Sequence, residues 1–217
     1  MTKNKHIYDL IAEGENQQLD FKFEINDSKK IARTLVAFAN TDGGTLLIGV
    51  KDNGNIAGIR SEEEYYMIEA ASEMYCNPKV DFEAKEWNLG GKIILEVKVQ
   101  SHPNKPHKAP DKDNNMKTYI RVADENILAP EVIALAWEKQ SMPKGRHIKI
   151  SKPIEKLFTY LNSNPYISTG KFQQIARIKH HTAQNILSDL LAIGSLEYLF
   201  VDKRIVYRIN KTNTENE

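Results

Sequence analysis

The sequence predicts an α+β protein made of two domains. A helical spacing of apolar residues within 28–40 is followed at once by a glycine turn and a short apolar run. Farther along, short strand-like runs occur in pairs across turn sequences, which indicates antiparallel hairpins rather than a doubly wound sheet. Near residues 141–145, Pro and Gly interrupt a helical pattern. A chain of 217 residues is also longer than one small core requires.

The first strongly predicted helix spans residues 28–40. Ser28 or Asp27 can cap its start, and Asn40 suits a left-handed position at its end. Its apolar residues recur at helical spacing on one face, which predicts that this face is buried. They are Ile31, Leu35, Val36, Phe38 and Ala39.

A hairpin is predicted directly after this helix. Gly43 and Gly44 allow a tight reversal, and the apolar run at 45–50 is typical of a buried strand. The Asp-Asn-Gly sequence at 52–54 favours a turn, so residues 55–59 are expected to return as the second strand.

The rest of the N-terminal domain is predicted to contain one more helix and three strands. Ser61 and Glu64 form a capping-box pattern, and Pro78 ends the helix that follows. The strands are expected at 80–87, 92–99 and 118–122, the first two joined as a hairpin across an Asn-Leu-Gly-Gly turn. This order of elements is α+β.

Three helices and a hairpin are predicted in the C-terminal domain. The helices are expected at 153–162, from Ser168 or Thr169, and at 179–193. The two strands of the hairpin are expected at 196–201 and 204–209. This order resembles the bacterial winged helix-turn-helix family, and the resemblance implies that the third helix reads DNA.

The domain boundary is placed at the Pro-Gly interruption, just after a helix with apolar residues from Val132 to Trp137. The expected domains are residues 1–144 and 145–211. A polar tail at 212–217 is expected to be disordered.

Composition restricts the class of protein. No segment approaches the apolar length of a membrane span, and the charged start lacks a secretory core, so a cytoplasmic location without membrane contact is expected. A single cysteine, Cys76, excludes an internal disulfide framework. The net charge of +1 hides an asymmetry, because residues 1–144 carry −4 and residues 145–217 carry +5. The basic C-terminal part is the better candidate for contact with phosphate.

A long part of the N-terminal domain resembles a known family. Residues 37–59, AFANTDGGTLLIGVKDNGNIAGI, closely resemble the core of the Schlafen-AlbA type nucleic-acid-binding domain. Upstream, residues 15–22 resemble its opening E-x-x-x-(apolar)-E-F-K strand. Downstream, KPH at 105–107 and YIRV at 119–122 resemble its K-P-(aromatic or His) loop and its Y-x-R-x strand. The resemblance covers residues 13–130 and implies a bacterial transcriptional regulator.

In eukaryotic Schlafen relatives, as the resemblance implies, three acidic residues form a metal-dependent ribonuclease site. The matching positions are Glu15, Asp20, where the family usually has Glu, and Asp52. Carboxylates are ligands that Mg²⁺ or Mn²⁺ prefers, and the metal would polarise a phosphodiester. Glu15 lies five positions before Asp20, so a turn or bulge must bring them to the same side of the strand. Asp52 has the alternative role of a turn residue.

The third helix of the C-terminal domain supplies the candidate DNA-reading residues, because the N-terminal half of this helix enters the major groove in helix-turn-helix proteins. They are Lys179, His181, Thr182, Gln184 and Asn185. Gln184 and Asn185 match adenine edges, and Thr182 can cap the helix or contact phosphate. Lys203 and Arg204 in the hairpin turn supply further cations.

Cations of the N-terminal domain form a second candidate contact. Lys22 can neutralise phosphate, and the long loop at 100–116 is expected to carry an anion-binding edge, with a solvated loop as the alternative. The edge would use Lys105, His107, Lys108, Lys117 and Arg121. ATP is not expected, because the chain has no G-x-x-x-x-G-K-[ST] motif and its paired glycines follow a helix instead of preceding one.

Three functions from different classes follow from these patterns. The first is a homo-oligomeric DNA-binding regulator, whose two-fold symmetry would match paired half-sites. The second is an endoribonuclease that depends on Mg²⁺ or Mn²⁺, and the third is an adaptor that binds protein. DNA is expected over RNA as the partner. Zinc at His180 and His181 is not expected, because neighbouring helix residues point in different directions.

Overall fold

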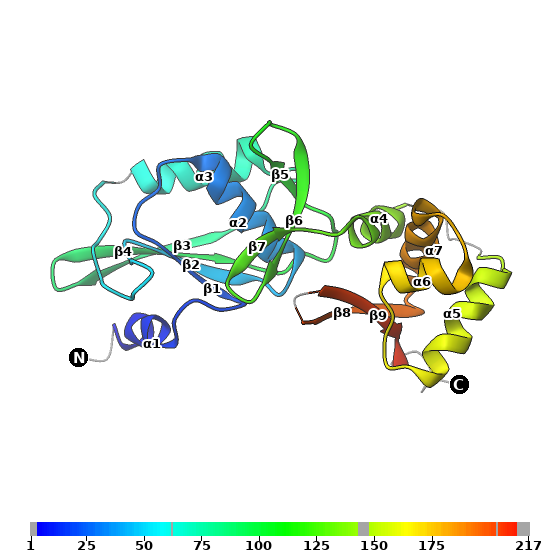
Figure 1. Cartoon of the computed structure of the whole chain (residues 1–217). Coiled ribbons are helices and arrows are strands. Elements are labelled where there is room, and N and C mark those ends of the chain that lie inside the picture. Colours follow the sequence, from blue (N-terminus) through cyan, green and yellow to red (C-terminus); the bar gives the residue numbers. More distant parts are fainter. Residues whose placement is uncertain (1–3, 62, 143–147, 203, 212–217) are drawn as a thin grey trace. The chain divides into compact units, whose positions relative to one another are not determined.

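The computed structural model describes residues 4–61, 63–142, 148–202 and 204–211 (Figure 1). The chain divides into two compact units, Met1–Ala129 and Pro130–Glu217. Both contain helices and strands, so the α+β class is confirmed. Lys203 and the expected tail at 212–217 lie outside the described residues.

A four-stranded sheet forms the centre of the first unit, in the order β1-β2-β4-β3. Strand β1 (Leu19–Lys22) runs parallel to β2 (Gly44–Ile48), with Leu19 opposite Thr45. Strand β4 (Lys92–Val99) is antiparallel to β2 and to β3 (Glu83–Leu89). The predicted second hairpin therefore forms.

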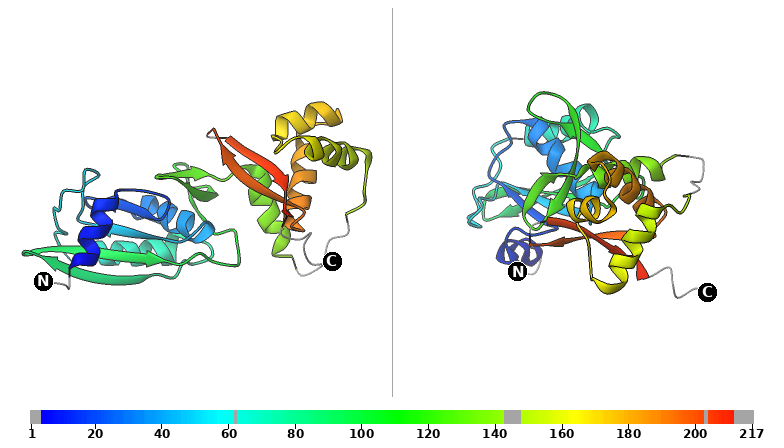
Figure 2. Two further views of the ribbon diagram at one scale, coloured as in Figure 1. Left: turned by 90° about the horizontal axis from the view of Figure 1, so that it is seen from below. Right: turned by 45° about the vertical axis from the view of Figure 1, so that its right-hand side comes forward.

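Helices cover both faces of this sheet, as Figure 1 shows. One face packs against α2 (Ser28–Asn40) and α3 (Glu63–Tyr75) and forms the larger core. The other face packs against α1 (Lys5–Glu13), which lies in front of the sheet in the view from below (Figure 2). Ile7 of α1 is fully buried there with Phe21, Leu47 and Ile94.

The helix at 28–40 is confirmed, and its cap is Asp27, whose carboxylate accepts hydrogen bonds from the backbone N–H groups of Lys29 and Lys30. The predicted hairpin after it is wrong in its pairing. Residues 45–48 pair with β1 and β4, and the segment at 55–59 contributes only an isolated bridge between Val50 and Ile56.

A second, three-stranded sheet packs against α2. It consists of β5 (Lys108–Pro110), β6 (Met116–Val122) and β7 (Glu125–Leu128). Asn40, the last residue of α2, is fully buried, and its Nδ2 donates to the carbonyl oxygens of His107 and Tyr119, each at 2.8 Å. The end of α2 thus holds the loop before β5 against β6.

The described residues of the second unit form four helices and one hairpin. The helices are α4 (Glu131–Gln140), α5 (Lys152–Ser163), α6 (Thr169–Ala176) and α7 (His180–Ala192). Strands β8 (Leu196–Val201) and β9 (Arg204–Ile209) form the hairpin, which runs beside α7 (Figures 1 and 2). Helix α4 packs on α7, and its Val132 and Ala136 belong to the core of this unit.

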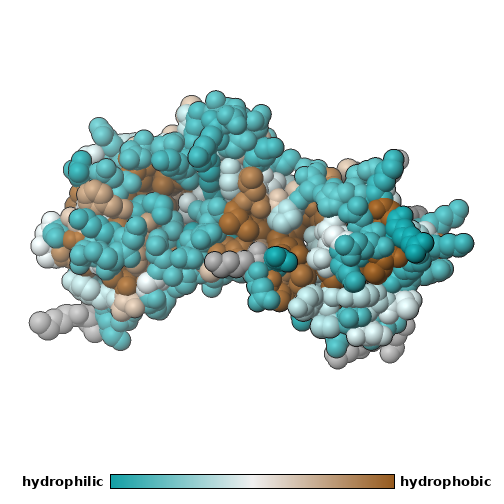
Figure 3. Space-filling view, viewed as in Figure 1, coloured by the Kyte–Doolittle hydropathy of each residue, from teal (hydrophilic) through white to brown (hydrophobic). Residues whose placement is uncertain are grey.

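The division between the units therefore precedes α4, whereas the sequence placed it at 144/145. Residues 143–147 lie outside the described part of the chain. No helix among the described residues is long and apolar enough to span a lipid bilayer. Hydrophilic side chains cover most of the face drawn in Figure 3, and the hydrophobic areas on it are smaller.

Candidate nucleic-acid interface

A short turn joins α6 to α7. Ser168 caps α6, because its Oγ accepts a hydrogen bond from the N–H of Lys171 at 3.2 Å. Arg177 ends α6 in the left-handed conformation, with φ 55° and ψ 49°, and Lys179 precedes the first residue of α7. His180 Nδ1 lies 3.3 Å from Gln173 Oε1, which links the two helices across the turn.

Helix α7 has a buried side and a polar edge. Ala183 and Leu187 are fully buried in the core of the unit. His181 and Asn185 are exposed and Gln184 is half-buried. Residues three and four apart lie on the same side of a helix, so these three side chains form one edge. The structure therefore brings together the residues that the sequence proposed for reading DNA.

One detail of this edge, the position of Thr182, differs from expectation. Thr182 lies within the first turn of α7 and is half-buried, and it does not cap the helix, which begins after Lys179 without a side-chain cap. Lys179 itself is exposed, so it remains available for contact with phosphate.

Polar contacts of Lys139, a residue of α4, link α4 to α7 next to the polar edge. Lys139 Nζ donates to Ser188 Oγ at 2.6 Å and to the carbonyl of Asn185 at 3.1 Å, and it lies 2.8 Å from Asp189 Oδ1. The Lys139 side chain is only 10% exposed. Sequence reasoning missed this residue, because it assigned α4 to the other domain.

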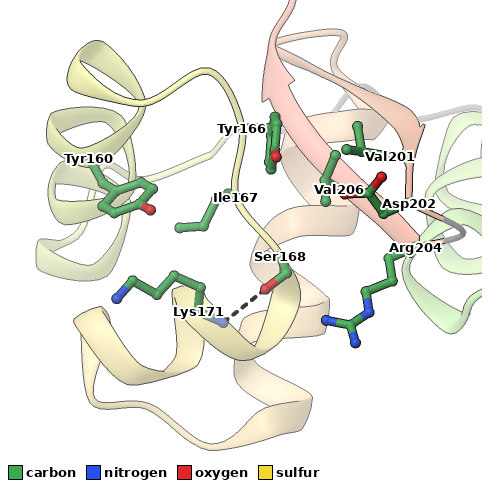
Figure 4. A pocket seen from close by; sticks show the side chains of 9 residues that line it. All are labelled: Tyr160, Tyr166, Ile167, Ser168, Lys171, Val201, Asp202, Arg204 and Val206. Atoms are coloured by element: carbon green, nitrogen blue, oxygen red, sulfur yellow. Dashed lines mark hydrogen bonds between the residues drawn. The ribbon is translucent and has the colours of Figure 1, made fainter.

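A hollow of about 480 Å³ lies between the start of α6 and the hairpin. Lys171 of α6 and Arg204 of the hairpin both line it, and Figure 4 shows Ser168 between these two residues. Both cations are exposed. The hollow is thus lined by two cations and by the exposed carboxylate of Asp202, and the sequence had proposed only Arg204 among the cations.

In the first unit, Glu15 and Asp20 lie side by side. Asn16 and Leu19 bridge across a turn at 17–18, and Glu15 Oε1 accepts a hydrogen bond from the N–H of Phe21 at 2.9 Å. The turn that the spacing required is therefore present. Burial and the neighbouring Asp20 carboxylate raise the pKa of Glu15 above its ordinary value.

Asp20 is buried between two cations. Its Oδ1 accepts a hydrogen bond from Arg121 Nη2 at 3.1 Å, and its Oδ2 lies 2.8 Å from Lys22 Nζ. The Oδ2 atom has no well-formed hydrogen bond among the described residues. The Lys22 side chain is 37% exposed, so it is tied to Asp20 while one side of it faces solvent.

The expected three-carboxylate metal site does not form. Asp52 is exposed in the turn after β2, and no group of three His, Cys, Asp or Glu residues in the described part of the chain is placed to hold a metal ion. The residues present do not fit a Mg²⁺ or Mn²⁺ site of the kind that three carboxylates would provide. The turn role is the one that the structure gives to Asp52.

Part of the expected anion-binding edge is buried, whereas Lys117 is exposed and Lys108 is half-buried. Arg121 is 1% exposed and donates to the carbonyl oxygens of Asn16 and Leu19 and to Asn126 Oδ1. Its charge is used inside the unit, so it cannot serve as a surface contact with phosphate. This could not be recognised from the sequence, since Asn16 and Leu19 lie about a hundred residues away in the chain.

His107 and Lys105 are also turned inward. His107 is 1% exposed, its Nδ1 lies 3.0 Å from the carbonyl of Pro78, and its Nε2 has no hydrogen-bond partner among the described residues. Lys105 Nζ donates to the carbonyl of Thr41 at 3.4 Å. Burial lowers the pKa of both side chains. They position the loop rather than form an exposed cationic edge.

Comparison with known proteins supplies a family for the first unit. The family model described as "Schlafen, AlbA_2" matches residues 15–130. No curated protein matches the chain.

Two solved structures are similar to part of the chain. The DIP2311 protein from Corynebacterium diphtheriae is 18% identical, with a TM-score of 0.45 over 62% of this chain and 32% of that one. The N-terminal domain of a protein from Nitrosomonas europaea, related by name to the ATP-dependent DNA helicase RecG, is 23% identical, with a TM-score of 0.37 over 56% of this chain and 93% of that one. This chain thus spans about a third of the first structure. These TM-scores do not establish a shared overall fold.

Proposed function

This chain belongs to the Schlafen, AlbA_2 family, and on that premise we propose that it is a DNA-binding transcriptional regulator. Family membership supports a function related to nucleic acid. The specific assignment to duplex DNA depends on the second unit, where three helices and a hairpin follow one another in the order of a winged helix-turn-helix domain.

The observation that carries the proposal is the polar edge of α7. His181, Gln184 and Asn185 lie on one side of the helix, directly after a short turn from α6, while Ala183 and Leu187 are buried. In a helix-turn-helix module this part of the second helix contacts base edges. Gln and Asn side chains can donate and accept together, as the edge of adenine requires.

Cations flank this edge at places suited to the DNA backbone. Lys179 precedes α7, and Lys171 and Arg204 enter the hollow between α6 and the hairpin. Phosphate contacts of this kind fix the position of a protein on DNA without reading sequence. The net charge of +5 over residues 145–217 adds a general attraction to the backbone. A dimer of the chain would match two half-sites related by a two-fold axis.

A metal-dependent ribonuclease has less support, because Asp52 does not join Glu15 and Asp20. A protein-binding adaptor is the remaining alternative, and it is an outcome of the test below.

The test is a fluorescence anisotropy titration of the full chain against a pool of labelled duplex DNA and against a structured RNA, at several salt concentrations. The proposal expects duplex binding whose affinity falls steeply with salt. The double variant Gln184→Ala with Asn185→Ala should weaken binding to the duplex sequences that the wild-type chain prefers and should leave non-specific binding in place. Asn162→Ala, an exposed Asn on α5, is the matched control. Absence of binding at low salt would favour the adaptor.

A further inference from the structure

Phe23, an aromatic residue just after β1, lies partly exposed between two cations. Its side chain is 38% exposed. Lys51 Nζ lies 5.2 Å from the centroid of its ring, and Arg60 Cζ lies 5.8 Å from the same centroid. Both distances fall within the range of a cation–π interaction. None of these three residues belongs to the candidate interface on the second unit.

The segment that carries the two cations is fixed by backbone hydrogen bonds. Gly49 and Val50 both donate to the carbonyl of Lys22, at 2.8 and 3.3 Å. Ala57 and Gly58 donate to the carbonyl of Gly49, at 2.8 and 2.9 Å. The segment therefore folds back on itself beside the end of β1, and it holds Lys51 and Arg60 on either side of a turn.

Gly49 makes this close return possible. Its φ is +93°, and a Cβ placed on it would lie 2.8 Å from the carbonyl carbon of Gly58. Such a contact excludes any side chain at this position. At the other end, Ile59 donates to the carbonyl of Ile93 of β4 at 2.7 Å, so the segment is tied to the sheet just before Arg60.

The surroundings of the ring are charged rather than apolar. Arg60 is paired with Glu24 at 3.3 Å, and its side chain is 73% exposed. Lys51 and Asp52 are exposed beside one another. Exposed ion pairs are weak and exchange partners readily, so Arg60 can turn from Glu24 to another anion.

We propose that Phe23, Lys51 and Arg60 form a stacking site for a base of single-stranded nucleic acid. The base stacks on the exposed part of the ring, and the two cations move from the ring to the neighbouring phosphates. Aromatic residues beside cations are the usual means by which proteins bind single strands without reading sequence. A duplex does not fit this site, because its bases are already paired and stacked. A protein partner is disfavoured, because an apolar anchor would need more apolar surface around the ring than the neighbouring charges leave.

This inference goes beyond the proposed duplex contact and uses only residues of the first unit. The two can therefore fail separately. The first test is an anisotropy titration of the full chain with a labelled 15-nucleotide oligo-dT at low salt. Phe23→Ala and Phe23→Leu should each raise the Kd about tenfold, because alanine substitution of a stacking residue has effects of this order.

Two further variants of the aromatic position separate stacking from a structural effect. Phe23→Trp should keep the affinity, and its fluorescence should be quenched on binding beyond the signal of the parent chain, which already contains two Trp. Tyr66→Ala removes another exposed aromatic, on α3, and should leave the Kd unchanged. Circular dichroism melts of all variants check that each one folds.

The role of the cations is tested by the salt dependence. Lys51→Gln should reduce the slope of log K against log salt by about 1, as expected for loss of one phosphate contact. Lys30→Gln, an exposed lysine on α2, is the matched control and should leave the slope unchanged.

The stacking site is refuted if the wild-type chain does not bind oligo-dT, or if Phe23→Ala and Phe23→Leu fold and bind like wild type. It is also refuted if Phe23→Trp binds without quenching. Titrations of the same variants with duplex DNA should match wild type. The oligo-dT result can therefore be interpreted even if the chain does not bind duplex DNA.

Discussion

Arg121 and Asp20 form a buried ion pair in which Nη2 of the guanidinium lies 3.1 Å from Oδ1 of the carboxylate. Their side chains are 1% and 4% exposed. The same guanidinium also donates to two backbone carbonyls of the turn before β1 and of β1 itself, those of Asn16 and Leu19. The pair therefore joins β6 to the start of the central sheet.

Breaking this pair should strongly destabilise the first unit. Arg121→Met leaves the Asp20 carboxylate buried without its main partner, and removal of one member of a buried pair costs about 3–5 kcal/mol. Urea unfolding followed by circular dichroism measures the change. Adding Asp20→Asn should recover part of the loss, because the uncompensated charge is removed. Arg208→Ala, which breaks the exposed pair with Glu197, is the control and should change stability by less than about 1 kcal/mol.

The stability of the first unit should fall as the pH drops below about 6.5, the ordinary pKa of histidine. Burial lowers the pKa of His107, so the unfolded chain binds a proton that the folded chain resists. The lowered pKa of His107 therefore stabilises the folded chain fully above pH 6.5, the ordinary pKa of histidine. This contribution is lost as the pH falls below 6.5. Thermal melts from pH 5 to 8 measure this dependence.

His107→Asn should flatten the pH dependence of the melting temperature in that window, whatever its effect at neutral pH. His181→Asn changes an exposed histidine of α7 and should leave the dependence as in wild type. Equal slopes for His107→Asn and wild type would contradict the assignment to His107.

Cys76 should be inert in the folded chain. Burial raises the pKa of its thiol to about 12, and its side chain is 7% exposed. The reactive thiolate is therefore scarce at pH 8. A colorimetric thiol reagent should react slowly with the native chain and should titrate one thiol after denaturation in urea. Fast reaction at native pH would show that the site opens readily.

Helix α4 should be required for the second unit to fold. Val132 and Ala136 are buried in its core, and Lys139 is bonded to α7. A segment of residues 130–217 should unfold cooperatively, whereas a segment of residues 145–217 exposes the apolar surface that α4 covers and should not. Thermal melts of the two segments compare them. Equal cooperativity would place the boundary after α4.

Lys139→Met should destabilise the second unit by about 1–3 kcal/mol, because Ser188 and Asp189 lose a charged partner. Lys152→Met, at an exposed position of α5, is the control. The comparison uses urea unfolding of the full chain, with the two units followed separately.

Local signals made part of this structure predictable. The cap at Asp27 and the apolar face of α2 act within a few residues, so the helix at 28–40 could be recognised from the sequence. The same holds for α7, where Ala183 and Leu187 mark the buried side and leave the polar edge opposite. The buried side and the polar edge of α7 could therefore be recognised from helical spacing.

Long-range partners made the rest unpredictable. The strand at 45–48 is an apolar run followed by a turn sequence, as in a hairpin, but it pairs with β1 and β4, which lie far from it in the sequence. Arg121 was expected at the surface, because nothing near it in the chain reveals that Asp20 lies beside it, 101 residues away. Tertiary pairing decided both cases.

Strand β3 is one of the two edge strands of the central sheet, and it carries several exposed charges. Glu83, Lys85 and Glu86 are all exposed along this strand. Charged edge strands resist pairing with another sheet, which protects a protein from joining its neighbours into fibres. Strand-to-strand extension at β3 is therefore disfavoured, and the proposed dimer is expected to use another surface.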